Sequence, residues 1–388
     1  MRLEKGIMSI TDVNDLPQLL RDVPAPTVSV QPESEEARAA HLRALPLQRM
    51  MGYGVELGDA LMIRSMVESG IDWIPAAEAV AERALALALG PGATEATRRR
   101  GLQRASAALR IAQIVESTDT AGRTARFLRS AEFFEQSVAG DQHWRRVVVP
   151  HAAGDLFGWW VRPVIPEGTE VPTVIVIGGM EGWAEDHSAV AGELTARGVG
   201  VVLLDGPGQG VTRMRSHHYL GPDFVDGYRA VVDWIVEEQR SPRPIGIWGN
   251  SMGGNFAMHV AAADPRIAAC CNNGGGCDLG ILGRERSRVF EKMRAMCGPV
   301  DDDIVWQTFA TTDLTADRVR QTCPTLVVVA GEDQLIPRED MTVLYDRTPA
   351  ADKQMFVFED AEHCVYRHPD EKHAVIADWF VDKLEVKS

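Results

Sequence analysis

The sequence after residue 140 consists of short, nearly continuous apolar runs separated by segments with helical periodicity. Strands that are buried on both faces of a parallel sheet have this texture, because neither face is exposed to water. A strand pair joined by the turn sequence HAAGD is expected ahead of these runs, over 144–150 and 156–163. The buried strands are expected at 173–179, 199–206, 244–250, 267–273, 325–332 and 354–360.

Helical patterns lie between most of the apolar runs. They cover 186–197, 222–239, 251–264, 338–347 and 371–385. Strands that alternate with helices predict an α/β fold with a mostly parallel sheet. The stretch of about 278–320 is too long for a simple loop, so we expect a small helical insertion there.

The residues before 140 have a different, helical texture. Apolar residues recur at helical spacing in 34–57, 74–90 and 94–117. The sequence up to about residue 35 is typical of an extended arm. We therefore expect two regions, an N-terminal helical region over 1–139 and an α/β domain over 140–388.

Charge and composition exclude several classes of protein. The formal net charge of −15 argues against nucleic acid or an anionic membrane as a partner, because both favour clustered Lys and Arg. No apolar run is long enough to span a membrane. The first twenty residues lack the continuous apolar stretch of a secretion signal, so we expect a cytoplasmic protein. The six cysteines have no zinc-site spacing, which predicts free thiols and no metal.

A serine stands between two glycines at the end of the run 244–250. Gly249-Asn250-Ser251-Met252-Gly253 is a G-x-S-x-G motif with a strand expected before it and a helix after it. In such a turn the flanking residues must be small, and the serine hydroxyl is raised above the sheet edge. The helix that follows directs its N-terminal N–H groups toward developing negative charge. The pattern predicts that Ser251 is a nucleophile.

A nucleophilic serine needs a base and an acid that orients the base. Asp333 follows the strand expected at 325–332, and His363 follows the strand expected at 354–360. Both therefore fall at carboxyl ends of strands, where open α/β sheets collect their functional groups. Glu332 and Asp340 are the alternative acids, and His368 is the alternative base. The order Ser251, Asp333, His363 favours a catalytic triad.

An acyl-transfer site also needs donors for the oxyanion. The N–H of Met252, directly after the serine, is the first expected donor. The second should come from the loop GGMEGWAEDH after the strand 173–179. Met180 is the preferred residue there, with Gly179 or Glu181 as the alternatives. Glycine at the start of this loop lets the backbone approach a substrate.

Several of these segments resemble α/β-hydrolases of the FrsA-like group. The resemblance lies in GGMEG, in DGPGQG at 205–210, in GNSMGGNFAMHVAAADPRIAACCNNGG, in GEDQLIP and in AEH. Within the group the chain is similar to 2,6-dihydroxypseudooxynicotine hydrolases and to the fungal hydrolases that shorten polyketides. The resemblance implies an α/β-hydrolase fold in which the N-terminal helices form a cap and a small helical insertion follows the sheet.

The resemblance also bears on the reaction. The pyridine-alkaloid hydrolases of the group cleave a carbon–carbon bond beside a carbonyl, and an additional acidic residue is associated with their site. Asp278 and Glu285 lie in the corresponding region, where solvation or helix capping is the favoured interpretation for both. Cleavage of an ester, a lactone or an amide therefore stands beside carbon–carbon cleavage.

The sequence as a whole predicts a cofactor-independent serine hydrolase. Its expected substrate is a small apolar or aromatic carbonyl compound that contacts Trp183, Tyr219 and Glu181. An acyltransferase with the same triad, or a catalytically silent scaffold that binds a ligand, is the alternative. Apolar N-terminal stretches such as ALPLQRMMGYGV also suggest a homodimer.

Overall fold

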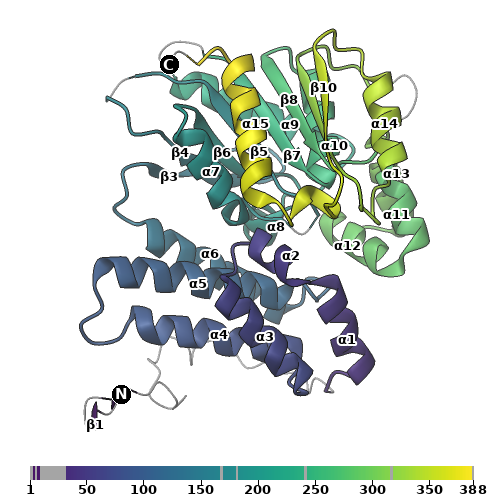
Figure 1. The fold of residues 1–388 in the computed structure, drawn as a ribbon. Coiled ribbons are helices and arrows are strands. Elements are labelled where there is room, and N and C mark those ends of the chain that lie inside the picture. Colours follow the sequence, from purple (N-terminus) through teal and green to yellow (C-terminus); the bar gives the residue numbers. More distant parts are fainter. Residues whose placement is uncertain are drawn as a thin grey trace. The chain divides into compact units, whose positions relative to one another are not determined.

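The computed structural model describes residues 3–4, 7–8, 32–166, 169–180, 182–239, 243–314 and 318–386. The chain divides into two compact units, Met1–Gly140 (unit 1) and Asp141–Ser388 (unit 2). Figure 1 shows the helices of unit 1 and the helix-flanked sheet of unit 2. Within the described residues, no helix is both long and apolar enough to cross a membrane.

Unit 2 is built on an eight-stranded sheet with the order β10-β9-β8-β7-β5-β6-β4-β3. Its strands are β3 (Trp144–Val149), β4 (Leu156–Val161), β5 (Thr173–Ile177), β6 (Gly200–Asp205), β7 (Ile245–Asn250), β8 (Ile267–Asn273), β9 (Thr325–Ala330) and β10 (Lys353–Phe358). Strand β4 runs antiparallel to β3 and β6, and the other pairs are parallel. The predicted mostly parallel sheet is confirmed, and each strand lies within two residues of its expected range.

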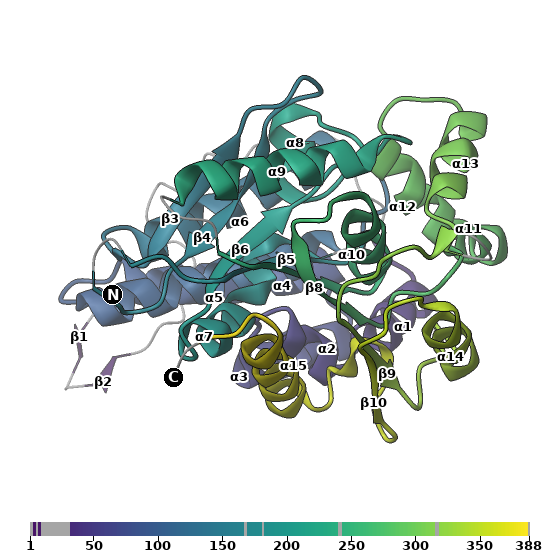
Figure 2. The same cartoon turned by 90° about the horizontal axis from the view of Figure 1, so that it is seen from above.

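Helices cover both faces of this sheet. Figure 2 shows α7 (Ser188–Thr195) and α15 (Pro369–Lys383) on one face, and α9 (Phe224–Glu238) and α10 (Met252–Ala263) on the other. Helices α7 and α15 contact each other, as do α9 and α10. Because both faces are covered, the central strands β5, β6 and β7 are buried along their whole length.

The order in which strands are added to the sheet reverses at β5, and this reversal determines where the site lies. After β5 the chain adds β6 on one side of it, and it later returns to add β7 on the other side. Open α/β sheets leave a crevice at the carboxyl ends of strands where the order reverses in this way. The residues after β5 and β7 therefore meet at one edge of the sheet.

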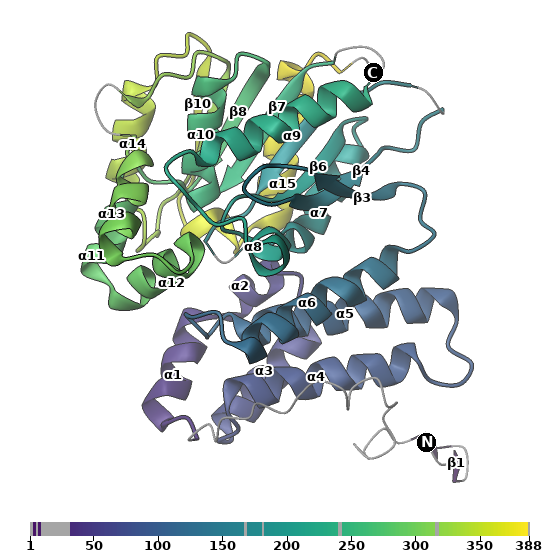
Figure 3. The ribbon, with the colours of Figure 1, turned by 180° about the vertical axis from the view of Figure 1, so that it is seen from behind.

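The insertion expected at about 278–320 contains three helices. They are α11 (Leu279–Glu285), α12 (Ser287–Cys297) and α13 (Asp302–Thr311), which contact one another (Figure 3). Asp278 caps the first of them, since its side chain accepts a hydrogen bond from the N–H of Gly280. Two more helices, α8 (Gly210–Ser216) and α14 (Arg338–Arg347), follow β6 and β9.

Unit 1 is helical over its described residues from 35 onward. Its helices are α1 (Glu35–Ala44), α2 (Leu47–Gly52), α3 (Leu57–Glu68), α4 (Trp73–Ala88), α5 (Glu95–Gln113) and α6 (Ala121–Val138). The pattern over 34–57 spans two of these helices, because Pro46 forces Leu45 out of helical geometry. Two short strands, β1 (Leu3–Glu4) and β2 (Ile7–Met8), pair antiparallel, and most of the arm expected before residue 35 lies outside the described residues.

Some apolar side chains of unit 1 remain exposed. Met51, Leu57 and Leu61 are each more than two-fifths exposed, on helices α2 and α3. Scattered exposed apolar residues are normal on a monomer. The homodimer stays a prediction.

The tight start of α10 generates a stability test. A methyl group at Gly253 would overlap the backbone carbonyl of Gly178, which cannot move without moving the sheet. We expect Gly253→Ala to lower the free energy of unfolding by at least about 1–3 kcal/mol. Gly192→Ala, in helix α7 with open space around it, should instead raise it by about 0.5–1 kcal/mol. Chemical denaturation measures both, and an unaffected Gly253→Ala protein would show that this contact is not tight.

Candidate active site

Ser251 occupies a strained turn between β7 and α10. Its backbone has φ 54° and ψ −129°, a combination that residues with a side chain rarely adopt. The turn is held closed by contacts that only glycine allows. A methyl group at Gly249 would overlap the backbone of Gly253, and one at Gly254 would overlap the side chain of Asn272. These contacts give the physical reason for the glycines on both sides of the serine.

The structure brings Ser251, His363 and Asp333 into one hydrogen-bonded chain. The distance between Ser251 Oγ and His363 Nε2 is 2.8 Å. The distance between His363 Nδ1 and Asp333 Oδ2 is 2.7 Å. The three residues follow β7, β10 and β9, so three strand ends supply the chain. A hydroxyl, an imidazole and a carboxylate in this order can pass a proton from the serine to the imidazole.

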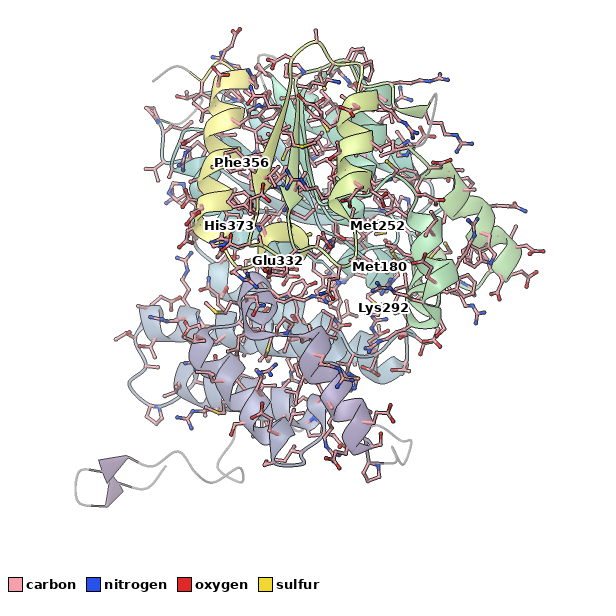
Figure 4. The ribbon with its side chains drawn as sticks, turned by 45° about the vertical axis from the view of Figure 1, so that its right-hand side comes forward. Met180, Met252, Lys292, Glu332, Phe356 and His373 are labelled. Atoms are coloured by element: carbon pink, nitrogen blue, oxygen red, sulfur yellow. The ribbon has the colours of Figure 1, made fainter. Side chains whose placement is uncertain are left out.

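The alternative residues lie elsewhere or have other partners. Asp340 is exposed in the first turn of α14. Glu332, labelled in Figure 4, forms an ion pair with Arg367 at 3.1 Å. His368 lies 3.0 Å from a carboxylate oxygen of Asp360. Asp333 is the acid that contacts His363.

Asp333 is fixed by backbone donors as well as by the imidazole. Its Oδ1 accepts hydrogen bonds from the N–H groups of Leu335 (2.8 Å) and Ile336 (2.9 Å), which leaves Oδ2 for His363. Burial raises the pKa of this carboxyl, but the hydrogen bond from His363 and the two backbone bonds outweigh it and lower the pKa below its usual value. Asp333 is therefore an anion at neutral pH.

The pKa of His363 shifts in the opposite direction. Burial lowers it, while electrostatic interaction with Cys364 and the hydrogen bond and negative charge of Asp333 raise it. The net direction is upward, because the interactions with Cys364 and with the Asp333 carboxylate together outweigh the effect of burial. An imidazole in this position accepts a proton more readily than a free histidine.

A buried polar network holds the His363 loop against the Ser251 turn. The carbonyl of Asn273, at the end of β8, accepts the N–H of Ser251 at 2.8 Å. The Asn273 amide donates to Asn250 Oδ1 (2.8 Å) and to the carbonyl of Cys364 (3.4 Å). Lys372, only 4% exposed, donates to the same Cys364 carbonyl at 3.0 Å.

The Cys364 carbonyl belongs to an unusual segment of backbone. Cys364 and Val365 both have positive φ, of 60° and 57°, directly after His363. Such backbone persists only where its surroundings hold it. Two donors on one carbonyl provide that support. Sequence reasoning missed both donors, because Asn273 appeared as part of a strand and Lys372 as part of a helical pattern.

The residues expected to form an oxyanion hole directly follow β5 and β7, at the edge of the sheet where the strand order reverses. Met252 is the first residue of α10, where a backbone N–H has no carbonyl one turn earlier in the helix to bind, and the Ser251 side chain does not cap this helix. Gly179 passes close to Ser251, since a Cβ on it would lie 2.9 Å from Ser251 Cβ. Met180 and Met252 pack in one apolar cluster (Figure 4). Glu181 lies outside the described residues.

The two other residues expected to contact substrate are engaged within the protein. Trp183 is 3% exposed at the start of the short helix η3 (Ala184–His187). The Tyr219 ring packs against Gly298 at the end of α12, and its hydroxyl lies 3.3 Å from His217 Nδ1. Their part in substrate binding stays a prediction.

Asp205, at the end of β6, joins the loops that follow β5 and β6. Its two carboxylate oxygens accept the N–H groups of Ala184 (2.9 Å) and Val211 (2.8 Å). Burial and the nearby Glu185 charge raise its pKa to about 7. Because Asp205 is completely enclosed, we assign it a structural role.

The structure also bears on metals and thiols. Among the described residues, no group of three or more His, Cys, Asp or Glu side chains could hold a metal ion. All six cysteines are free. Burial raises the pKa of Cys270 and Cys271 well above the usual value, so these thiols are not reactive nucleophiles.

The sheet order, and the serine turn at the edge where that order reverses, are those of the α/β-hydrolase fold. Residues 169–277 match the family model described as serine aminopeptidase, S33. The chain is 31% identical over 225 residues to 2,6-dihydropseudooxynicotine hydrolase of Paenarthrobacter nicotinovorans, covering 57% of this chain and 60% of that protein. It is 34% identical over 200 residues to the alpha/beta hydrolase ucsC of an Acremonium species, covering 45% and 40%.

The chain thus spans less than two thirds of the length of these curated relatives. Among solved structures, the crystal structure of 2,6-dihydroxy-pseudo-oxynicotine hydrolase matches with a TM-score of 0.74 at 23% identity, covering 87% of this chain and 95% of that one. This likeness shows the fold alone. The part of this chain that it covers is longer than unit 2. The predicted resemblance to the pyridine-alkaloid and fungal hydrolases is confirmed.

The contact between Asp333 and His363 generates a titration test. In Asp333→Asn the carboxylate charge is lost, so the imidazolium loses its stabilisation and the pKa of His363 should fall. In the wild type, His363 should release its proton at higher pH than an ordinary histidine. NMR titration of the His363 ring in both proteins measures the difference. A pKa that rises or stays the same in Asp333→Asn would contradict this account.

Proposed function

We propose that this protein is a cofactor-independent serine hydrolase with Ser251 as its nucleophile. The observation that carries the proposal is the chain of contacts from Ser251 Oγ through both His363 nitrogens to Asp333, at 2.8 and 2.7 Å. These distances lie within the range for a nucleophile and its general base. The similarity to named hydrolases supports the same class.

The reaction begins when Ser251 Oγ attacks a carbonyl carbon and its proton passes to His363 Nε2. Asp333 stabilises the imidazolium from the Nδ1 side and keeps the ring oriented. The negative charge that develops on the carbonyl oxygen is stabilised by the N–H of Met252 and by an N–H of the loop after β5. His363 then protonates the leaving group, and water repeats the sequence to release the acyl group.

The leaving atom decides which bond is cleaved. His363 can protonate oxygen, nitrogen or carbon, so the substrates considered are esters, lactones, amides and ketones with a cleavable carbon–carbon bond. The N-terminal unit is proposed to take part in choosing among them, on the basis of its resemblance to the cap of related hydrolases. Unit 2 by itself contains the sheet and the three residues of the triad.

Substitution of the nucleophile tests the proposal directly. Ser251→Ala should lose about 10⁴- to 10⁶-fold in kcat and should no longer react with a fluorophosphonate probe. Ser251→Gly should be equally inactive but more stable than Ser251→Ala, because glycine accepts φ 54° without strain of about 1–3 kcal/mol. Active-site labelling and thermal unfolding measure the two effects. A wild-type protein that resists labelling would point to a silent scaffold instead.

A small neutral substrate is the second part of the proposal. Arg213 donates to the carbonyl of Gly208 at 3.1 Å, and Arg215 lies over the Phe157 ring. These contacts, together with the overall negative charge, disfavour a site that clamps a carboxylate.

A matched pair of substrates tests this preference. We expect a neutral aryl ester to have a higher kcat/KM than the same ester carrying a carboxylate, by about 10-fold. The comparison is repeated at several salt concentrations. An anionic ester that is preferred, with a preference that added salt erodes, would reveal an arginine clamp and contradict the proposal.

A further inference from the structure

Gln209, within the segment DGPGQG, is a buried side chain whose polar atoms are all engaged. It is 2% exposed and lies directly before helix α8. Its Oε1 accepts the N–H of Gly206 at 3.0 Å and the hydroxyl of Tyr228 at 3.4 Å. Its Nε2 donates to two consecutive carbonyl oxygens after β5, those of Gly178 (2.7 Å) and Gly179 (2.9 Å).

The orientation of this amide is unambiguous. The backbone N–H of Gly206 can only donate, so the atom facing it must be the amide oxygen. The carbonyls of Gly178 and Gly179 can only accept, so the atom facing them must be the amide nitrogen. A carboxylate, which only accepts, would repel both carbonyls.

The Gly179 carbonyl shares a rigid plane with the N–H of Met180. In a trans peptide the C=O and the N–H point in opposite directions. Fixing the carbonyl toward Gln209 therefore fixes the N–H on the other side of the plane. The N–H of Gly182 adds a second, longer bond to the same carbonyl at 3.3 Å. Gly179 itself lies beside the nucleophile, since a Cβ on it would be 3.3 Å from Ser251 Oγ.

We propose that Gln209 is a positioning residue that holds the Gly179–Met180 peptide in the one orientation that presents the Met180 N–H to the oxyanion. The inference rests on the proposed serine hydrolase function and names a part of the site that the triad does not include. Gln209 acts through the peptide, and it need not touch the substrate.

The chain supplies a matched control in Gln239, which follows helix α9 and contacts the start of β5, whereas Gln209 contacts the loop after the end of β5. It too is buried, at 6% exposed, and its amide donates to the Val171 carbonyl (3.2 Å) and to Thr173 Oγ1 (3.1 Å). Gln239→Glu therefore introduces the same chemical change at β5 without touching the Ser251 end. Gln209→Glu and Gln239→Glu should both lower the free energy of unfolding, but only Gln209→Glu should weaken the stabilisation of the oxyanion.

The experiment compares 4-nitrophenyl acetate with its thiono analogue, in which sulfur replaces the carbonyl oxygen. Backbone N–H groups stabilise a developing oxygen anion better than a sulfur anion, so an intact oxyanion hole favours the oxygen ester. We expect Gln209→Glu to lower kcat for the oxygen ester by about 10- to 100-fold, less than the loss of a whole donor. The ratio of kcat/KM for the two esters should fall at least several-fold.

The outcomes separate this inference from the proposed function. In Gln239→Glu the oxygen-to-sulfur ratio should match the wild type, and fluorophosphonate should still label Ser251 in both variants. A folded Gln209→Glu protein with an unchanged oxygen-to-sulfur ratio of kcat/KM would overturn the inference without contradicting the proposed serine hydrolase function. A wild-type protein that neither reacts with fluorophosphonate nor cleaves the oxygen ester would instead contradict the proposed function.

A measurement on the wild type covers the case in which Gln209→Glu fails to fold. A crystal structure with phenylboronic acid bound to Ser251 should place a boronate oxygen within hydrogen-bond distance of the Met180 N–H. The Gly179 carbonyl should still face Gln209. A boronate oxygen that avoids Met180, or a peptide turned away from Gln209, would overturn the inference.

Discussion

The close approach of the start of α10 to the end of β5 is the contact on which the site depends. Gly253 packs directly against the carbonyl of Gly178, with no room for even a methyl group between them. This contact brings the turn that carries Ser251 next to the loop that carries Gly179. Ser251 and the Gly179 peptide beside it thus follow strands that are adjacent in the sheet, although more than 70 residues separate them in the chain.

Buried amide side chains then secure the backbone around this contact. Gln209 binds the loop after β5, and Asn273 joins the Ser251 turn to the carbonyl of Cys364. An amide suits both positions because it donates and accepts at once and carries no charge that burial would penalise. Backbone groups in loops beyond the strand ends have no neighbouring strand to bind. These amide side chains supply the hydrogen bonds that a neighbouring strand would otherwise provide.

Backbone strain is found at Ser251 and directly after His363, on both sides of the hydrogen bond that joins the two side chains. Ser251 has a positive φ, and His363 is followed by two residues that do as well. The rest of unit 2 offsets this cost through a sheet buried on both faces. The arrangement is consistent with a rigid scaffold that holds a few unfavourable backbone conformations in place for chemistry.

The sequence by itself determined the α/β class, the strands of unit 2 and the three residues of the hydrogen-bonded chain, Ser251, His363 and Asp333. These features have local signals: continuous apolar runs mark buried strands, and glycines flank a turn that tolerates no side chain. Only the tertiary structure decided the hydrogen-bond partners of Gln209, Asn273 and Lys372. Gln209 reads locally as part of a turn and Lys372 as part of a helix. Their partners lie on loops far away in the chain, and the strand order alone brings those loops together.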